Sequence, residues 1–136
     1  TLMRVVGFMD GVTGRVLSWD FPKVTVYRLA RCLSQVPQAY PEAKRIFLVW
    51  DNWPNHWHPV VLQAVQKDPR LVVVPLPTHA PWLNAIEKLW RLLHQEASHA
   101  HPWCDDFNQF RQNILDKLGE FSAGSQRLLL YCGLSY

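Results

Sequence analysis

Long apolar segments and paired cysteines are both missing from this sequence. Its apolar runs are far shorter than the ~20 consecutive residues that a bilayer-spanning helix needs, so no membrane span is predicted. The cysteines Cys32, Cys104 and Cys132 are widely spaced and form no C-x-x-C pair, which disfavours a disulfide framework and a thiolate zinc site. We interpret them as reduced core thiols. A basic and apolar leader is also missing, and the predicted location is cytoplasmic.

A strong excess of charge of one sign is missing as well. The 136 residues include 14 Lys and Arg against 11 Asp and Glu, which gives a net charge of +3. This value is compatible with a polyanionic partner but is too small to indicate one by itself. Hydrophobic residues make up 49% of the chain and charged residues 18%, which is typical of a globular protein with one domain and a real core.

The N-terminal third of the chain predicts a hairpin and a helix. Residues 3–9 and 14–20 are rich in β-branched and apolar residues and flank the two glycines of GVTG, which favours a β-hairpin. From Val24 to about Val36 the apolar positions recur every three and four residues, as on a helix that packs on a core. We expect Pro37 to end that helix, because proline cannot donate the helical hydrogen bond.

A strand, a helix and a second strand follow, and together they predict a βαβ unit over residues 45–76. RIFLVWD, residues 45–51, is a continuous apolar run of the kind that is buried on both faces in a parallel sheet. Pro59 is well placed in the first turn of a helix that runs to about Lys67, and LVVVPL at 71–76 is the next buried strand. Such a unit places its strands parallel, with a right-handed crossover, in an open α/β sheet.

Helices are predicted for the rest of the chain. One begins near Leu83 and runs over residues 83–98, after a stiff proline-rich approach. Asp105 or Asp106 can cap another, which Gly119 closes, and a short final helix brings the C-terminal helices to residues 105–131. The inward positions predicted after the cap are Phe107, Phe110, Ile114 and Leu118.

Asp51 and Glu87 are the candidate catalytic residues. Asp51 ends the first strand of the βαβ unit, and ligands of open α/β sheets bind at the carboxyl ends of strands. On a helical wheel Glu87 falls beside Leu83 on the shoulder of the buried face, where a carboxylate is sheltered from open water. Carboxylates from two elements repel each other unless a cation lies between them, and oxygen ligands favour Mg²⁺ or Mn²⁺. Both residues are therefore also candidate metal ligands, although phosphodiester chemistry with two ions calls for a third carboxylate.

The same residues have ordinary structural interpretations. Asn84-x-x-Glu87 has the spacing of a capping box, and Glu87 with Arg91 is an i, i+4 ion pair. Asp51 with Asn52 suits a simple turn after a strand. These alternatives stay open on the spacing alone.

Histidines and tryptophans are frequent in the predicted loops. Two H-x-H pairs lack a third ligand at helical spacing, so they predict no zinc site. They are His56 with His58 and His99 with His101. The seven tryptophans mostly suit packing, but those near the candidate site could instead stack on bases. These are Trp53, Trp57 and Trp82.

Three stretches together resemble the DDE transposases of the mariner superfamily, especially its bacterial insertion-sequence branch. They are VVGFMDGVTGRV, FLVWDNWPNHWHPVVLQAV and VVVPLPTHAPWLNAIEKLWRLLHQE, and the likeness covers nearly the whole chain. Its most specific parts are Asp51-Asn52 followed by His56, and Leu-Pro-x-x-x-Pro-x-Leu-Asn-x-Ile-Glu-x-x-Trp from Leu76 to Trp90. A chance match of both motifs at this separation is very improbable.

The resemblance implies an RNase H-like (ribonuclease H) α/β fold, two Mg²⁺ (or Mn²⁺) ions, and phosphodiester cleavage with strand transfer at transposon ends. Asp51 is then the second acid of the triad and Glu87 the third. The implied partners are the DNA of the transposon ends and the target, with a homodimer in the parent protein and no membrane. Candidate DNA contacts are Lys88, Arg91, Asn84, His56 and Trp82, with Lys44 and Arg45 as weaker ones.

The sequence departs from that family at the first acid. The family carries it on a strand before the hairpin, so the first central strand is predicted to be missing from a single partial domain over residues 1–136. Asp10 lies where the hairpin turn begins, and no catalytic role is carried onto it. We expect this chain to be the catalytic portion of a DNA transposase and to be inactive by itself. The alternatives are a non-catalytic remnant that only binds DNA or protein, and an RNase H-like nuclease unrelated to transposition.

Overall fold

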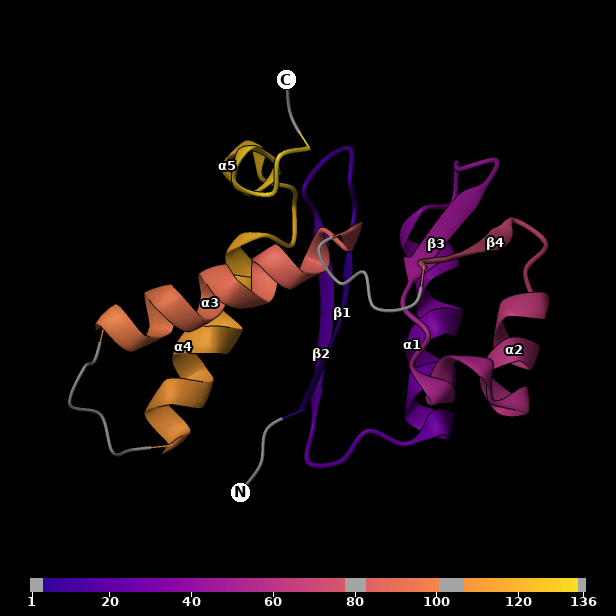
Figure 1. The fold of residues 1–136 in the computed structure, drawn as a ribbon, viewed down its shortest axis with the longest axis horizontal. Helices are drawn as coiled ribbons and strands as arrows, with labels where there is room; N and C mark the ends of the chain where they lie inside the picture. Colours follow the sequence, from indigo (N-terminus) through magenta and orange to yellow (C-terminus); the bar gives the residue numbers. More distant parts are fainter. Residues whose placement is uncertain (1–3, 78–82, 101–106, 135–136) are drawn as a thin grey trace. The chain divides into compact units, whose positions relative to one another are not determined.

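The computed structural model describes residues 4–77, 83–100 and 107–134. The chain packs as two compact units, and each is treated separately (Figure 1). Unit 1 consists of Thr1–Pro22 and Ala85–Tyr136, and unit 2 of Lys23–Asn84. Helices and strands occur in both units, so the predicted mixed α/β class is confirmed. No helix in the described part of the chain is long and apolar enough to cross a membrane.

Unit 1 contains the predicted hairpin. Strand β1 (Arg4–Met9) pairs antiparallel with β2 (Val16–Phe21), close to the expected bounds. At the turn, the Asp10 carboxylate accepts hydrogen bonds from the backbone N–H groups of Val12 (2.7 Å) and Thr13 (3.1 Å). Asp10 therefore stabilises the hairpin turn.

The tip of the hairpin packs closely against the chain just before α5 (Gln126–Tyr131). The backbone N–H of Ser125 donates to the carbonyl oxygen of Thr13 at 2.9 Å. Gly14 follows with a φ of 75°, and a Cβ at this position would lie 2.2 Å from the carbonyl oxygen of Ser125. Only glycine fits both the left-handed backbone and this approach.

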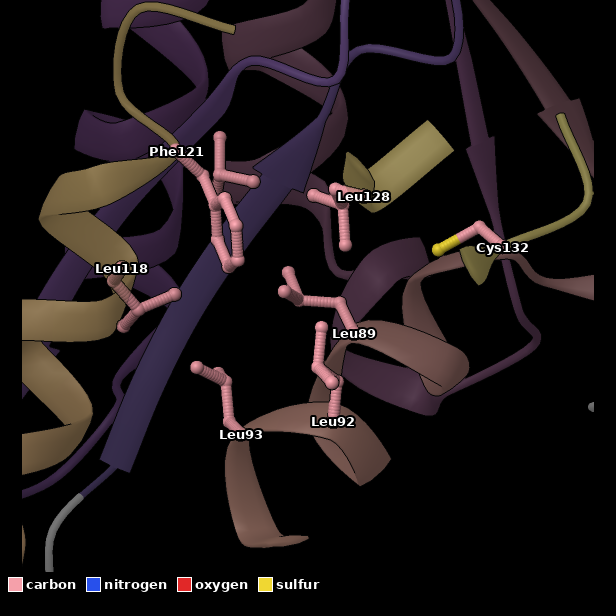
Figure 2. Close-up of a cluster of buried hydrophobic side chains, with 8 residues drawn as sticks. Leu89, Leu92, Leu93, Leu118, Phe121, Leu128 and Cys132 are labelled. Carbon is pink, nitrogen blue, oxygen red and sulfur yellow. The ribbon is translucent and has the colours of Figure 1, made fainter. Parts of the chain in front are cut away.

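Two longer helices, α3 (Ile86–Ala100) and α4 (Phe107–Glu120), complete unit 1. Figure 2 shows leucines of α3 that point toward side chains of α4 and α5, and these side chains form one buried cluster. Its members are Val16, Leu89, Leu92, Leu93, Leu118, Phe121, Leu128 and Cys132. Trp90 of α3 lies against β1, where a Cβ on Gly7 would come within 2.7 Å of the indole ring.

The predicted boundaries of these helices were partly wrong. Helix α3 begins at Ile86 instead of Leu83, and α4 continues past Gly119 to Glu120. A Cβ on Gly119 would meet no other part of the described chain within 4 Å, and the φ of this glycine lies outside the left-handed region. Gly119 therefore fits an ordinary helical turn. The proposed capping residues Asp105 and Asp106 lie outside the described residues.

Unit 2 is the predicted βαβ unit, preceded by a helix. Strands β3 (Ile46–Trp50) and β4 (Leu71–Pro75) are parallel, with Leu48 opposite Val73. Helix α2 (Pro59–Gln66) connects them and starts at Pro59 as predicted. Helix α1 (Val26–Ala39) packs on α2, and Figure 1 shows both helices in this unit.

The prediction that Pro37 ends α1 was wrong, because the helix continues to Ala39. The carbonyl group of Pro37 accepts hydrogen bonds from the backbone N–H of Tyr40 (3.2 Å) and from the Arg70 guanidinium (3.1 Å). The same guanidinium donates to the carbonyl oxygens of Tyr40 (2.7 Å) and Ala43 (3.1 Å). The three bonds from Arg70 satisfy carbonyl groups at and just after the end of α1 from a distant part of the chain and help to offset the disruption by proline.

Asp68 holds the Arg70 side chain in this position. Its carboxylate accepts hydrogen bonds from Nε (3.1 Å) and Nη2 (3.0 Å) of Arg70. The guanidinium lowers the pKa of Asp68 below its ordinary value, mainly through these hydrogen bonds. We call the interactions of Arg70 with Asp68 and the three carbonyl groups the Arg70 clamp.

Strand β3 is not buried on both faces, contrary to the prediction. Leu48 and Trp50 are buried, but Phe47 and Val49 on the other face are 62% and 51% exposed. Side chains alternate between the faces of a strand, so the face that carries Leu48 and Trp50 is packed and the opposite face of β3 is exposed. Val74 of β4 adds to the exposed apolar face.

Two cysteines confirm the expectation of reduced core thiols. Cys32 and Cys132 are buried and free. Burial raises the pKa of Cys32 to about 11 and also raises the pKa of Cys132, because a thiolate loses hydration there. Cys104 lies outside the described residues.

We expect Gly14→Ala to lower the free energy of unfolding by about 1–3 kcal/mol, because alanine is strained at positive φ and would meet the Ser125 carbonyl group. Urea denaturation followed by circular dichroism measures this. Gly119→Ala is the matched control, and it should be neutral or stabilising by up to about 1 kcal/mol in a helix. Equal stability of Gly14→Ala and wild type would contradict the close packing of the hairpin tip.

We expect Asp68→Asn to lower the melting temperature at pH 7, and the difference from wild type to shrink in acid. The pKa of Asp68 is lower in the folded than in the unfolded chain, so the carboxylate stabilises the fold above its unfolded value of about 3.9. That contribution is lost as the pH falls through the folded-state pKa. Thermal unfolding from pH 7 to pH 2 tests this, with Asp116→Asn on exposed α4 surface as control. A difference that does not change with pH would contradict the Arg70 clamp.

Candidate active site

Asp51 is the first residue after β3, at the carboxyl end of the strand where the sequence predicts a site. Its side chain is 54% exposed. Oδ1 accepts a hydrogen bond from the backbone N–H of Trp53 at 3.1 Å and lies 3.3 Å from Nδ1 of His56. Among the described residues, Oδ2 takes part in no hydrogen bond or ion pair. One carboxylate oxygen is thus held by the loop, and the other is open.

His56 packs against the same loop. It lies in the short 3₁₀ helix η1 (Pro54–Trp57), and its ring stacks on Trp50 with centroids 4.5 Å apart and planes 6° apart. The edge of the ring meets Trp53 at a centroid distance of 5.3 Å. Nδ1 lies 2.9 Å from the backbone carbonyl oxygen of Asp51. A carbonyl oxygen can only accept, so the imidazole proton in this bond is on Nδ1.

Asn52 ties the loop to the end of the neighbouring strand. Its Nδ2 donates to the carbonyl oxygen of Leu76 at 3.2 Å, and the backbone N–H of Leu76 donates to the carbonyl oxygen of Trp50 at 2.9 Å. Leu76 opens the second of the two specific sequence motifs, and Asp51-Asn52 opens the first. The two motifs therefore meet at the carboxyl ends of β3 and β4.

Two of the three tryptophans predicted near the site lie in this loop. Trp53 and Trp57 are both exposed, and the edge of Trp57 packs on Trp50 at a centroid distance of 6.1 Å. Their position near Asp51 agrees with the prediction, and stacking on bases stays a prediction. Trp82 lies outside the described residues.

Glu87 lies in the first turn of α3, where the helix dipole favours a carboxylate. Its side chain is exposed, so the expectation of a sheltered position was wrong in this respect. The ordinary i, i+4 interpretation is not supported either, because no ion pair joins Glu87 and Arg91 within the described ranges. Glu87 therefore presents an accessible carboxylate.

The predicted DNA contacts on α3 differ in their surroundings. Lys88 is half-buried, and its Nζ donates to the carbonyl oxygen of Cys132 at 3.4 Å. Cys132 caps the C-terminus of α5, where a cation stabilises the last carbonyl groups, so Lys88 has a structural role that the sequence did not predict. Arg91 is exposed, and Asn84 is half-buried just before α3.

The two candidate ligands are chemically suited to a hard divalent cation. Asp51 and Glu87 offer carboxylate oxygens, which Mg²⁺ and Mn²⁺ prefer. The part of the chain that the structure describes contains no group of three His, Cys, Asp or Glu side chains that could hold a metal ion. Asp51 belongs to unit 2 and Glu87 to unit 1, so their meeting around a cation stays a prediction.

A parallel strand pair with a carboxylate at its carboxyl end is typical of α/β enzymes that bind ligands at this edge. A model of the DDE superfamily endonuclease family matches residues 2–111, and the chain belongs to this family. The family resemblance seen in the sequence is thereby confirmed.

The chain is also similar to a curated insertion-element protein. This is the IS630 uncharacterized 39 kDa protein of Shigella sonnei, with 26% identity over 99 residues. The similarity covers 71% of this chain but only 29% of the relative, so the chain spans less than a third of that protein. No solved structure matches the chain.

Proposed function

We propose that the chain is a catalytic portion of a DNA transposase that cleaves phosphodiesters at transposon ends and joins them to target DNA. Family membership and the insertion-element relative support the proposal. The observation that carries it is the Asp51 carboxylate at the end of β3, with Oδ1 bound to the loop and Oδ2 open. The proposed core is RNase H-like, and the proposed location is the cytoplasm, where a bacterial host keeps its DNA.

Asp51 and Glu87 are the residues that we propose to hold Mg²⁺ or Mn²⁺. Such ions, when bound, activate an attacking oxygen and stabilise the leaving oxygen of a phosphodiester. Asp51 contributes through its open Oδ2, and Glu87 through its exposed carboxylate at the start of α3. The attacking groups would be water in cleavage and a freed 3′-hydroxyl in strand transfer.

The proposed substrate is DNA, held by residues next to the carboxylates. Arg91 is the best candidate for a phosphate contact, because it is exposed one helical turn after Glu87. Asn84 and Trp82 precede α3 and remain weaker proposals, as do Lys44 and Arg45 before β3. Lys88 is less suited, since its ammonium group already binds the Cys132 carbonyl group. We further propose that the parent protein acts as a homodimer.

We expect Asp51→Asn and Glu87→Gln each to raise the dissociation constant for Mn²⁺ at least about 10-fold, since changes to outer-shell partners of metal sites already have this effect. Titration of the chain with Mn²⁺, with the free ion counted by electron paramagnetic resonance, measures the constant. Glu42→Gln, an exposed carboxylate in unit 2, is the control. If each substitution removed a separate ion and left the other unaffected, the two carboxylates would not share a site.

We expect this chain alone not to nick supercoiled plasmid in Mg²⁺, because two carboxylates do not hold two ions as three do. In a longer protein that adds the family's strand with the first acid, nicking should occur. Asp51→Asn or Glu87→Gln should then reduce it below detection with thermal stability unchanged.

Other outcomes of the nicking experiment are equally informative. Loss of nicking only in parallel with loss of thermal stability would assign the two residues to the turn and the helix start instead. A longer protein that binds DNA but never nicks it would favour the non-catalytic remnant, which the lack of a three-acid group among the described residues makes the second candidate.

A further inference from the structure

We propose that His56 is a positioning residue that fixes the Asp51 carboxylate, so that Oδ2 faces outward to a cation. The inference rests on the proposed function and adds a residue to its site. His56 was predicted from the sequence as a DNA contact. Its surroundings favour a different role, because its ring is only 15% exposed and its Nδ1 faces Asp51.

The ring itself is held rigidly. Trp50 is buried and lies flat against one face of the imidazole, and Trp53 meets its edge. The stack fixes the plane of the ring, and the hydrogen bond from Nδ1 to the Asp51 carbonyl oxygen selects one of the two flipped orientations in that plane. Because His56 stacks on a buried tryptophan at the end of β3, the loop is anchored to the sheet at this point.

The Nδ1 proton of His56 then acts on both ends of Asp51. It donates to the backbone carbonyl oxygen at 2.9 Å and lies 3.3 Å from Oδ1 of the side chain. The backbone N–H of Trp53 donates to the same Oδ1. The hydrogen bond from Trp53 N–H to Oδ1, with the His56 Nδ1–H group 3.3 Å from the same oxygen, favours one rotamer of the carboxylate, and the second oxygen is left for a ligand. Carboxylates that bind metals are commonly oriented by hydrogen bonds of this kind.

Substitution of His56 by asparagine or by glutamine tests the effect of the Nδ1 donor separately from the effect of the stacked ring. The side-chain amide of His56→Asn reaches the position of Nδ1, whereas that of His56→Gln reaches the position of Nε2, and both variants lose the stacked imidazole. The Asn variant therefore keeps the bond to Asp51 and the Gln variant does not. His58→Asn is a control in the same loop, because His58 only caps α2 by accepting from Val60 N–H and asparagine caps equally well.

The test is nuclear magnetic resonance of the full 136-residue chain. In wild type we expect the proton of His56 on Nδ1, and three-bond couplings of Asp51 that report a single χ1 rotamer. His56→Asn and His58→Asn should keep the single rotamer, and His56→Gln should average it. Titration with Mg²⁺, followed by the shifts of Asp51, should show a dissociation constant about 10-fold higher in His56→Gln than in His56→Asn.

Three results would overturn the inference: an averaged Asp51 rotamer in wild type, a fixed rotamer in His56→Gln, or equal Mg²⁺ affinities of the Asn and Gln variants. Wild-type shifts of Asp51 that do not respond to Mg²⁺ would refute the proposed metal site instead. In that case the rotamers would still decide whether His56 orients the carboxylate.

Discussion

The parallel pairing of β3 with β4 is the constraint on which the candidate site depends. Parallel strands need a crossover, and α2 supplies it, so both strands end at the same edge of the sheet. The loop after β3 must therefore leave the sheet beside the end of β4. The hydrogen bonds of Leu76 with Trp50 and Asn52 close this edge, and they fix the position at which Asp51 leaves the strand.

Aromatic packing gives that loop a structure that its backbone alone would lack. A loop rich in polar residues and prolines usually has few buried contacts. Here Trp50 extends the hydrophobic core to the last residue of β3, and His56 and Trp57 pack on it from the loop. An exposed carboxylate beside a rigid aromatic support can be accessible to a ligand and still hold one geometry.

Local patterns in the sequence predicted the helices and strands. The predictions that failed concern features that depend on residues far away in the sequence. The apolar run of β3 and Pro59 of α2 identified the βαβ unit, because periodicity and helix starts are local properties. Pro37 was misjudged because Arg70, 33 positions away, satisfies the end of α1. The exposed face of β3 and the bond from Lys88 to Cys132 depend on tertiary packing in the same way. Asp51 could be found from its place after a strand, but no period or spacing rule predicts the stack of His56 on Trp50.

Unit 1 is built from two segments that are far apart in the sequence, and this affects the order in which its parts can fold on the ribosome. Unit 2 is one continuous segment, so all of its residues are available for folding once residue 84 has been made. The hairpin of unit 1 is made before unit 2, but its partners are made after unit 2, since Arg15 of the hairpin binds the carbonyl group of Ser122, 107 positions later. Contacts over such separations form slowly because a long loop must close. The hairpin therefore stays without its core until the helices of residues 85–136 have been made, and in that interval its apolar side chains are exposed to chaperones and to aggregation.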